Sequence, residues 1–546
     1  MSKVITERRV IAALTAALLG SAAFATQAQA AACENLAYLN LPHTVITAAQ
    51  SIPAGSYTPP GSTTTLTGLP AFCRVTATIS PVPDSSIGIE VWLPNNWNGK
   101  YQQSGSHGFG GIFYWSEMAP QIIRGYATAI TDMGHTAAGG NGFDVSWGIG
   151  HPQKIIDFGW RAVHELAEKA KLIIATYYGQ QPRYAYFNGC SDGGREGLKS
   201  AQMFPRDFDG IIAGSGFPDY TGNETEAFVN DINSQNGGLV GAARTSALTL
   251  VGNAVTKACD ALDGVTDGII RDPRSCHFDP RTLVCAAGQS TNCLTQGEAD
   301  AINENYRTVR DPVTGKYVMS GMKRGSEFNQ IVFDWTGRFS IFQLNAYALA
   351  FQNVNPPTLT TFDLHKDLPV LEKVEGSNDA LDTELTAFRQ NGGKLIEWHG
   401  WGDGATVPGF IVKYYGEVVD QTGHGRVENV QDFYRLFMMP GVGHCGTGPG
   451  PDDIGGENQT PVSHDPEHDV VSALEAWREN GFAPQKLIAS KLNVANNPAA
   501  GIVMQRPLCP YPSEAIYKGS GSTNDASNFY CGPSHEDTDD DDDHRH

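Results

Sequence analysis

The sequence predicts an α/β fold, in which a doubly wound sheet forms a core that is interrupted by one large insertion. Strand-like and helix-like segments alternate from about residue 31 to residue 216, and this alternation returns after residue 382. Such alternation is typical of a sheet covered by helices on both faces. The intervening stretch carries four cysteines and shows little regular periodicity. We therefore expect a core of residues 31–216 and 383–533, with residues 217–382 as an inserted domain.

Apolar periodicity locates the elements in the first half of this core. The expected strands are residues 88–93, 126–132, 184–188 and 209–213, and the expected helices are residues 157–178 and 192–203. The longer helix carries apolar residues at helical spacing, namely Trp160, Val163, Leu166, Ala167 and Leu172. The shorter helix is expected to end before Pro205, because proline cannot continue a helix.

The second half of the core continues the same alternation. Its expected strands are residues 394–398 (KLIEW) and 434–438 (YRLFM), and its expected helices are residues 408–416 and 470–480. A return to regular segments after the insertion indicates that both halves belong to one sheet.

Both ends of the chain are expected to lie outside the fold. Three basic residues (Lys3, Arg8 and Arg9) precede an apolar run, and small residues follow it at positions 28–30. That order is typical of a secretory signal peptide, and the run is too short to span a bilayer. We therefore expect residues 1–30 to be removed on export and the protein to be secreted or periplasmic. Seven acidic residues crowd positions 536–543, so residues 534–546 are predicted to form a disordered acidic tail.

Composition argues against several classes of partner. The formal net charge is −21 and no basic stripe occurs, so neither nucleic acid nor a membrane is expected as a partner. The ten cysteines include no C-x-x-C pair, and an even number in an exported chain favours disulfides over a zinc cluster. A neutral molecule or a small ester is expected as the substrate rather than a polyanion, and the chain is expected to be a monomer or a homodimer.

Residues 189–193 (GCSDG) form a candidate nucleophile turn around Ser191. The motif follows an expected strand and opens an expected helix, and its glycines permit a sharp turn between them. Such a turn lifts the serine hydroxyl above the sheet and directs the N–H of Asp192 toward a developing oxyanion. The pattern G-x-S-x-G alone does not show that Ser191 is a nucleophile, because a chain this rich in glycine is expected to contain roughly half a match by chance.

Two later strands supply a candidate acid and base for this serine. In α/β-hydrolases the order along the chain is serine, acid, histidine, each after a strand. Asp403 follows the strand KLIEW and His444 follows the strand YRLFM, so the order and the positions both fit. Taken singly, Asp403 is also readable as a turn residue and His444 as a loop histidine. Cys190 precedes the serine and Cys445 follows the histidine, so a formed triad would bring two sulfurs together for a disulfide.

With these residues in place, the chain resembles the tannase and feruloyl esterase family, which includes mono(hydroxyethyl) terephthalate hydrolase. The matching stretches are GCSDGGREGLKSAQMFPRDFDGIIAGSG, CDALDGVTDGII, HGWGDG, MPGVGHC and RPLCPYP, and they spread over nearly the whole exported chain. The resemblance implies an α/β-hydrolase core with a lid at residues 217–382. It also implies hydrolysis of hydroxycinnamic or gallic acid esters through an acyl-enzyme, with the catalytic triad Ser191, Asp403 and His444.

The resemblance further implies disulfide pairings and an oxyanion hole. Sequence arithmetic cannot choose among the connectivities of ten cysteines. The family pattern implies Cys33–Cys73, Cys190–Cys445, Cys259–Cys276, Cys285–Cys293 and Cys509–Cys531. It also implies an oxyanion donor from the glycine-rich loop 104–111, in addition to Asp192. We favour the N–H of Gly105, with a flexible glycine turn as the alternative.

The segment CDALDGVTDGII is a candidate cation loop, with carboxylates at Asp260, Asp263 and Asp267. Hard oxygen ligands on a tight loop suit Ca²⁺, but the spacing is not that of an EF-hand and solvated turns explain it equally well. The resemblance favours a structural Ca²⁺ in the lid, with the backbone carbonyls of Val265 and Ile269 as further ligands.

The lid is expected to decide which aromatic ester is preferred. The terephthalate hydrolase of the family grips a free carboxylate with a lid arginine, whereas residues 353–382 contain no arginine and only the cations Lys366 and Lys373. This disfavours a terephthalate monoester, which stays the alternative substrate. His399, beside the acid loop, is interpreted as either a substrate contact or a structural residue. The candidate pocket aromatics are Phe109, Phe113, Tyr114, Trp115, Trp335 and Phe339. Because most aromatic residues belong to a core, none of them is assigned to the pocket.

Two other classes of function stay open at this point. One is a secreted binding protein on a hydrolase scaffold that no longer turns over, against which the intact Ser191, Asp403 and His444 argue. The other is a calcium-dependent adhesion protein, which predicts repeated Asp-rich loops where this chain has one.

Overall fold

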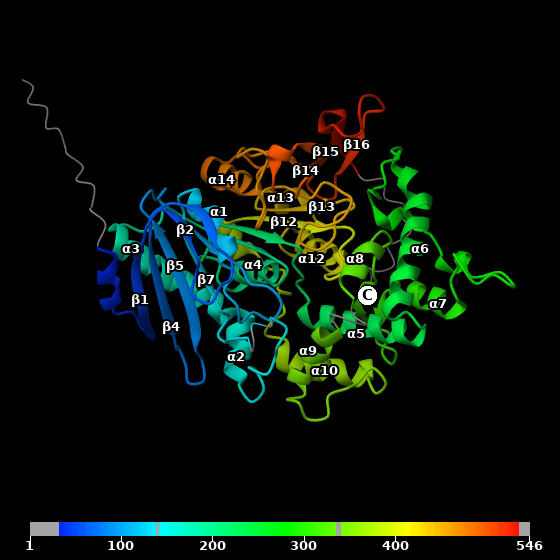
Figure 1. Cartoon of the computed structure of the whole chain (residues 1–546), viewed down its shortest axis with the longest axis horizontal. Helices are drawn as coiled ribbons and strands as arrows, with labels where there is room; N and C mark the ends of the chain where they lie inside the picture. Colours follow the sequence, from blue (N-terminus) through cyan, green and yellow to red (C-terminus); the bar gives the residue numbers. More distant parts are fainter. Residues whose placement is uncertain (1–31, 138–139, 141, 335–339, 534–546) are drawn as a thin grey trace, which may run out of the picture.

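A large mixed sheet forms the centre of the protein (Figure 1). The computed structural model describes residues 32–137, 140, 142–334 and 340–533. The expected signal peptide (1–30) and the expected acidic tail (534–546) lie outside the described residues. Within the described residues, the central sheet has the strand order β1-β4-β5-β7-β6-β8-β9-β12-β13. Their bounds are β1 (Thr44–Ile52), β4 (Phe72–Ile79), β5 (Ile87–Pro94), β6 (Lys100–Ser104), β7 (Ala127–Thr131), β8 (Tyr184–Cys190), β9 (Gly210–Gly214), β12 (Lys394–Gly400) and β13 (Tyr434–Met439).

The two ends of this sheet differ in strand direction. From β1 through β4 and β5 to β7 each neighbour is antiparallel, whereas β7, β6, β8, β9, β12 and β13 run parallel. Parallel neighbours carry their strand ends to one edge, which is where catalytic loops collect in α/β proteins. The strand β12, after the insertion, pairs directly with β9, before it, so both halves of the chain share one sheet. The predicted α/β-hydrolase architecture is confirmed.

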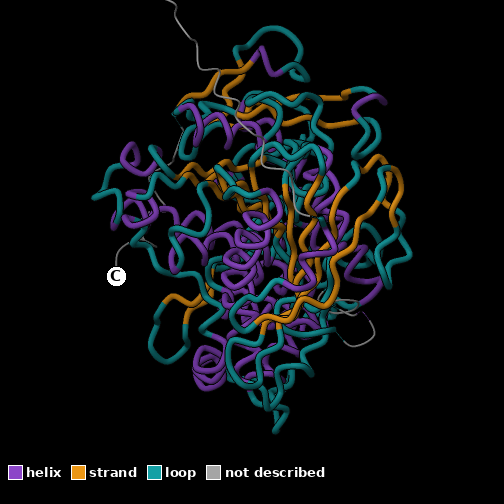
Figure 2. The backbone as a smooth tube through the Cα atoms, turned by 90° about the vertical axis from the view of Figure 1, so that its left-hand side faces the viewer, coloured by secondary structure: helices purple, strands orange, loops and turns teal. Residues whose placement is uncertain are grey.

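Helices cover both faces of the parallel part, as Figure 2 shows in a view with strands between helices. The covering helices include α1 (Trp115–Ile123), α3 (Ala162–Tyr178), α4 (Asp192–Met203), α12 (Pro408–Gln421) and α14 (Val470–Asn480). In β8, Phe187 faces a main core with Leu198 of α4, and Tyr186 faces a second core with Leu474 of α14. Successive strand residues point to opposite faces, so the continuous apolar run of a buried strand supplies two cores.

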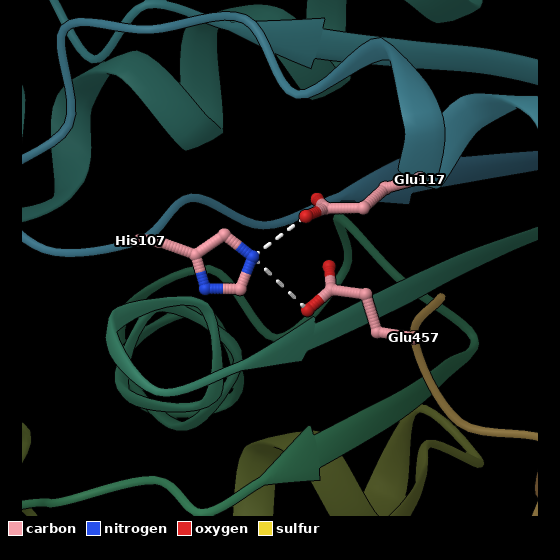
Figure 3. A group of neighbouring side chains, drawn as sticks. All are labelled: His107, Glu117 and Glu457. Atoms are coloured by element: carbon pink, nitrogen blue, oxygen red, sulfur yellow. Dashed lines mark hydrogen bonds and ion pairs between the residues drawn. The ribbon is translucent and has the colours of Figure 1, made fainter. Parts of the chain in front are cut away.

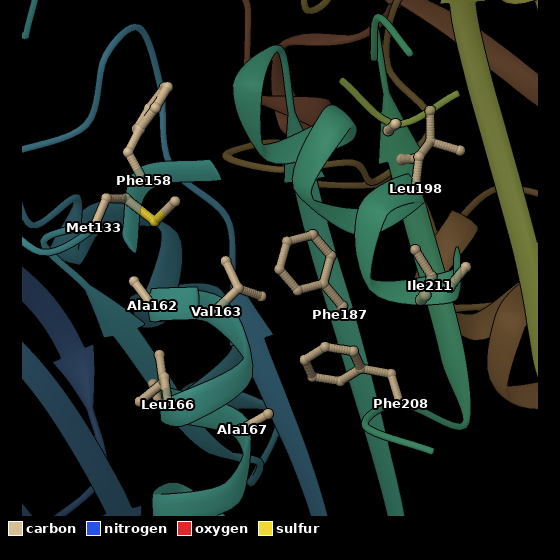
Figure 4. Packing of buried hydrophobic residues seen from close by; sticks show 14 of the residues in the cluster. Met133, Phe158, Ala162, Val163, Leu166, Ala167, Phe187, Leu198, Phe208 and Ile211 are labelled. Atoms are coloured by element: carbon tan, nitrogen blue, oxygen red, sulfur yellow. The ribbon is translucent and has the colours of Figure 1, made fainter. Parts of the chain in front are cut away.

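The main core explains one difference from the sequence prediction. Figure 4 shows Val163 of α3 beside Phe187 of β8, with Phe208 below Phe187 and Leu166 below Val163. Leu172, expected on the same buried face, is 40% exposed, because the buried stripe continues instead through Ile173 and Ile174. A helix face advances by 3.6 residues per turn, and Leu172 lies just outside the stripe that it defines.

The insertion is largely helical, which the sequence periodicity did not predict. Its helices include α5 (Tyr220–Asn236), α6 (Gly241–Cys259), α7 (Gln296–Asn305), α8 (Glu327–Val332), α9 (Ser340–Ala350) and α10 (Leu364–Glu375). One part has its own core, which includes Val251 of α6 and Ile302 of α7. Another part joins the main core through Phe228 of α5 and Tyr347 of α9. Apolar periodicity does not predict these helices, because small and polar residues interrupt the apolar residues along their buried faces.

Ten cysteines form five disulfides, with the pairing that the resemblance implies. They are Cys33–Cys73, Cys190–Cys445, Cys259–Cys276, Cys285–Cys293 and Cys509–Cys531. In the part of the chain that the structure describes, none of the helices combines the length and apolar character needed to cross a bilayer.

Candidate active site

Ser191 lies on a sharp turn between β8 and α4. Its backbone has φ 63° and ψ −122°, a conformation that costs a non-glycine residue strain. The N–H of Ser191 donates to the carbonyl of Gly214 on β9 at 2.9 Å, which fixes the turn against the neighbouring strand. A Cβ on Gly189 would meet backbone atoms of Gly193 at 2.7 Å, so the turn closes only with glycine there.

The expected acid and base meet the serine in one hydrogen-bonded line. His444 Nε2 lies 2.9 Å from Ser191 Oγ, and His444 Nδ1 lies 2.9 Å from Asp403 Oδ2. These residues follow β8, β12 and β13, three parallel strands that end at the same edge of the sheet. The arrangement is that of an activated serine: a base in contact with the hydroxyl and a carboxylate that orients the base.

Asp403 is fully buried yet held as a carboxylate. Burial alone would raise its pKa, but the charge and hydrogen bond of His444 lower the pKa of Asp403 to about 2. The N–H groups of Ala405 and Thr406 donate to its Oδ1 at 2.8 and 2.9 Å, and the hydroxyl of Thr406 donates to its Oδ2 at 2.9 Å. A carboxylate held by this many donors keeps its charge and its orientation toward the imidazole.

The disulfide Cys190–Cys445 lies directly beside the serine and the histidine. It joins residues 255 positions apart in the sequence. The N–H of Cys445 also donates to the hydroxyl of Ser215, just after β9, at 3.2 Å. The serine and histidine loops are therefore connected covalently as well as through the triad.

The structure corrects the expected role of Gly105 as an oxyanion donor. Its N–H donates to the carbonyl of Asn188 at 3.0 Å, which extends the β6–β8 ladder and leaves no donor for a substrate. A Cβ on Gly105 would meet the Cα of Gly193 at 2.6 Å, so this glycine serves the close approach of the loop to the serine turn. Asp192 lies at the first position of α4, where backbone N–H groups have no intrahelical partner.

The loop after Gly105 offers other donors. The N–H of Ser106 donates to Glu196 at 3.2 Å, whereas those of His107 and Gly108 have no acceptor within the described residues. The carbonyl of Ser106 accepts from the N–H of Gly193 at 2.8 Å, which ties this loop to the serine turn.

Gly105→Ala is expected to lower the free energy of unfolding by about 2 kcal/mol and to reduce esterase activity. The added methyl group must displace backbone at the serine turn, where the nearest atom would be 2.6 Å away. Gly416→Ala in α12 is the matched control, because a Cβ there meets nothing within 4 Å. It is expected to be neutral or stabilising by up to about 1 kcal/mol. Urea unfolding measures both, and equal stability of the two variants would contradict the steric role.

Two residues of the insertion reach the site without any signal in the sequence. Asn329 of α8 accepts from the N–H of Gly404 at 2.7 Å and donates to the hydroxyl of Thr447 at 3.0 Å, so it bridges the acid and histidine loops. Phe333 lies edge-on to the His444 ring, with centroids 5.1 Å apart. The insertion therefore contributes to the walls around the triad.

His399 has a structural role and is not a substrate contact. Its side chain is fully buried, Nε2 lies 2.9 Å from the carbonyl of Thr406, and burial lowers the pKa of His399. It supports the loop of Asp403 from behind and has no exposed surface for a substrate.

The candidate pocket aromatics divide into several environments. Phe109 is buried against Phe158, and Phe113 stacks on Trp115 of α1 in a small core, with ring centroids 5.8 Å apart. Tyr114 lies edge-on to His107 at 4.7 Å. Trp335 and Phe339 lie outside the described residues.

The expected calcium residues lie on one loop, closed by the Cys259–Cys276 disulfide. Asp260 accepts from the N–H groups of Asp267 and Gly268 at 3.1 and 3.0 Å, and Asp267 forms an ion pair with Arg506.

The other expected calcium residues also form hydrogen bonds within the loop. The Asp263 carboxylate accepts from the N–H of Val265 at 2.9 Å, and the N–H of Ile269 donates to the Asp267 carboxylate at 3.1 Å. The carboxylates of Asp260, Asp263 and Asp267 thus bind backbone N–H groups of their own loop and Arg506. A calcium ion at this loop stays a prediction.

The comparisons with known proteins agree over nearly the whole chain. A family model described as Tannase and feruloyl esterase matches residues 73–532. An uncharacterised esterase of Xanthomonas campestris pv. campestris is 36% identical over 95% of this chain and 94% of that protein. A probable feruloyl esterase B-2 of Aspergillus terreus is 30% identical over 94% of this chain and 97% of that protein. The crystal structure of feruloyl esterase B from Aspergillus oryzae is similar with a TM-score of 0.83 at 28% identity, covering 92% of this chain and 99% of that chain.

Proposed function

Because the chain belongs to the tannase and feruloyl esterase family of carboxylic ester hydrolases, we propose that it cleaves hydroxycinnamic or gallic acid esters with Ser191 as nucleophile. The observation that carries the mechanism is the line of two 2.9 Å contacts from Ser191 through His444 to Asp403. This geometry also argues against a binding protein on an inactive scaffold, which needs no activated serine.

Catalysis proceeds in two halves. His444 takes the proton of Ser191 as the hydroxyl attacks the ester carbonyl, and Asp403 stabilises the imidazolium that forms. The N–H of Asp192 stabilises the oxyanion, together with an N–H from His107 or Gly108. His444 then protonates the leaving alcohol, and water attacks the acyl-enzyme with the same imidazole as base.

An aromatic acyl group suits the surroundings of the triad. Phe333 places an aromatic edge against His444, which favours ring-to-ring contact with a substrate. The cations between residues 353 and 382 are exposed, and Lys366 pairs with Asp363, so neither lysine offers a buried partner for a terephthalate carboxylate. A hydrolysis panel of methyl ferulate, methyl gallate, chlorogenate and a terephthalate monoester tests the proposal. The highest kcat/KM is expected on one of the first three, and a preference for the terephthalate monoester would overturn it.

The CDALDGVTDGII loop is proposed to bind a structural Ca²⁺ through Asp260, Asp263, Asp267 and the carbonyls of Val265 and Ile269. The ion would supply positive charge to a carboxylate-rich loop in the lid and take no part in the reaction. Adding Ca²⁺ to chelator-treated protein is expected to raise the Tm, and Asp263→Asn is expected to remove most of that rise. Asp279→Asn, on an exposed turn, is the control. Equal responses of wild type and Asp263→Asn would contradict the calcium site.

Export to the periplasm or the medium is proposed from the sequence of residues 1–30 and from the five disulfides, which persist in oxidising compartments.

A further inference from the structure

A cluster of one histidine and two glutamates lies next to the serine turn and is not used by the mechanism (Figure 3). His107 follows β6, Glu117 belongs to the first turn of α1, and Glu457 lies between β13 and α14. His107 Nε2 is 2.6 Å from Glu117 Oε1 and 3.6 Å from Glu457 Oε2. Among the described residues, this is the one set of three His, Cys, Asp or Glu side chains whose ligand atoms all lie within 4.8 Å of one another.

Both carboxylates are buried without compensation by a fixed cation. The side chains of Glu117 and Glu457 are 1% and 5% exposed, and within the described part of the chain no lysine or arginine forms an ion pair with either. Burial raises the pKa of Glu117 to about 8, and burial together with the charge of Glu117 raises that of Glu457. Two carboxyl groups beside one imidazole need either protons held within the cluster or a bound cation.

Each of the two glutamates has one carboxylate oxygen that the described residues leave without a hydrogen bond. Glu117 Oε2 and Glu457 Oε1 are both buried and accept no hydrogen bond from the described residues. Figure 3 shows that the Glu457 oxygen without a dashed line is directed toward the Glu117 carboxyl group. Buried polar atoms without partners are rare in folded proteins, and binding an ion is one way in which such oxygens are satisfied.

We propose that His107, Glu117 and Glu457 form a binding site for one divalent transition-metal ion, with Zn²⁺ as the expected occupant. One imidazole nitrogen and two carboxylate oxygens are ligands that Zn²⁺ accepts at four-coordinate sites, and the two negative charges match the ion. Ca²⁺ is disfavoured, because it prefers six or more oxygen ligands. The amide of Asn458, which donates to Glu117 at 3.2 Å, lies close enough to complete the shell with its oxygen after a flip.

The position of this site indicates a role in holding the active-site loops. Glu457 accepts from the N–H of Cys190, the residue before Ser191, at 2.9 Å. His107 belongs to the loop that carries the second oxyanion donor. A metal ion at the cluster would tie that loop, helix α1 and the segment of Glu457 to the serine turn, without contacting the substrate.

Zinc binding to the chelator-treated full chain tests the site. Isothermal titration with ZnCl₂, in excess Ca²⁺ to fill oxygen-only sites, is expected to show one more tight equivalent in wild type than in His107→Gln. Any Zn²⁺ bound by the other histidines, including those of residues 534–546, is common to both proteins and cancels. His151→Gln is the matched control, because His151 lies 2.6 Å from Asp84 but has one carboxylate only. This control is expected to keep the full stoichiometry, and His107→Gln to bind at this site ~100-fold more weakly.

A second readout keeps the test independent of variant folding. Co²⁺ added to wild type is expected to give the visible absorption band of a low-coordinate imidazole–carboxylate site, which Zn²⁺ displaces and Ca²⁺ does not. The double variant Glu117→Gln/Glu457→Gln is expected to lose that band. Equal zinc stoichiometry in wild type and His107→Gln, or an identical Co²⁺ spectrum in the double variant, would overturn the proposal in favour of a shared proton. Neither measurement depends on turnover, so the proposed ester hydrolysis is tested separately.

Discussion

Replacement of Ser191 by alanine is expected to lower kcat/KM for methyl ferulate by at least about 10⁴-fold. Without the Oγ atom no acyl-enzyme can form, and the 2.9 Å contact with His444 is lost. The loss should fall on kcat rather than on KM, because Ser191 contributes to the reaction and not to holding the aromatic ring. Steady-state kinetics on methyl ferulate measure the two constants, and a fluorophosphonate probe should label wild type and not the variant.

Ser200→Ala is the matched control for this experiment. Ser200 lies on the same helix α4, and its hydroxyl donates to the carbonyl of Glu196 at 2.8 Å, away from the triad. Its kcat/KM is expected to stay within about twofold of wild type, because only a local helix hydrogen bond is removed. If Ser191→Ala kept activity near that of Ser200→Ala, the acyl-enzyme mechanism would be wrong.

The candidate triad was accessible from sequence because each member occupies a topologically defined place. Ser191, Asp403 and His444 each follow a strand with a recognisable apolar run, and parallel strands end at a common edge. The helix α4, Asp192–Met203, was predicted with its observed bounds, since the glycine turn starts it and Pro205 follows it. The ends of a helix are therefore predictable from sequence where neighbouring glycine or proline residues set them.

The role of Gly105 is not predictable from its local sequence. Its place in a glycine-rich loop suggested a free N–H, but whether that N–H is free depends on the pairing of β6 with β8. That pairing depends on residues far away in the sequence. It uses the N–H of Gly105 within the sheet, so this glycine allows the close approach of the loop to the serine turn instead of binding the oxyanion. His107 and Glu457 are 350 residues apart and Asn329 is 115 residues from His444, so no spacing rule connects them.

Sequence periodicity does not predict the helices of the insertion for a related reason. The helix α6 runs from Gly241 to Cys259 with many small and polar residues. Its stability comes from packing on α8, from the core that it shares with α7 and from the Cys259–Cys276 disulfide. Tertiary contacts of this kind outweigh a weak local pattern.

Removal of the Cys190–Cys445 disulfide, by Cys190→Ala/Cys445→Ala, is expected to have the largest effect on stability. A crosslink restricts the unfolded chain more when it closes a longer loop, and this one spans 255 positions, so the free energy of unfolding should fall by about 5 kcal/mol. Activity should fall as well, because the link positions the loops of Ser191 and His444, and a shift of about 1 Å at a reacting group costs on the order of 100-fold in rate.

Cys285→Ala/Cys293→Ala is the control that separates crosslinking from the loss of any disulfide. This bridge spans 8 positions within the insertion, so its loss should cost only about 2 kcal/mol and leave kcat/KM unchanged. Urea unfolding and methyl ferulate kinetics on both variants give the comparison. Equal losses of stability, or full activity without the Cys190–Cys445 link, would mean that hydrogen bonds alone hold the triad: those of Asp403, of Asn329 and of Ser215 with Cys445. In that case the covalent link would contribute to stability and not to catalysis.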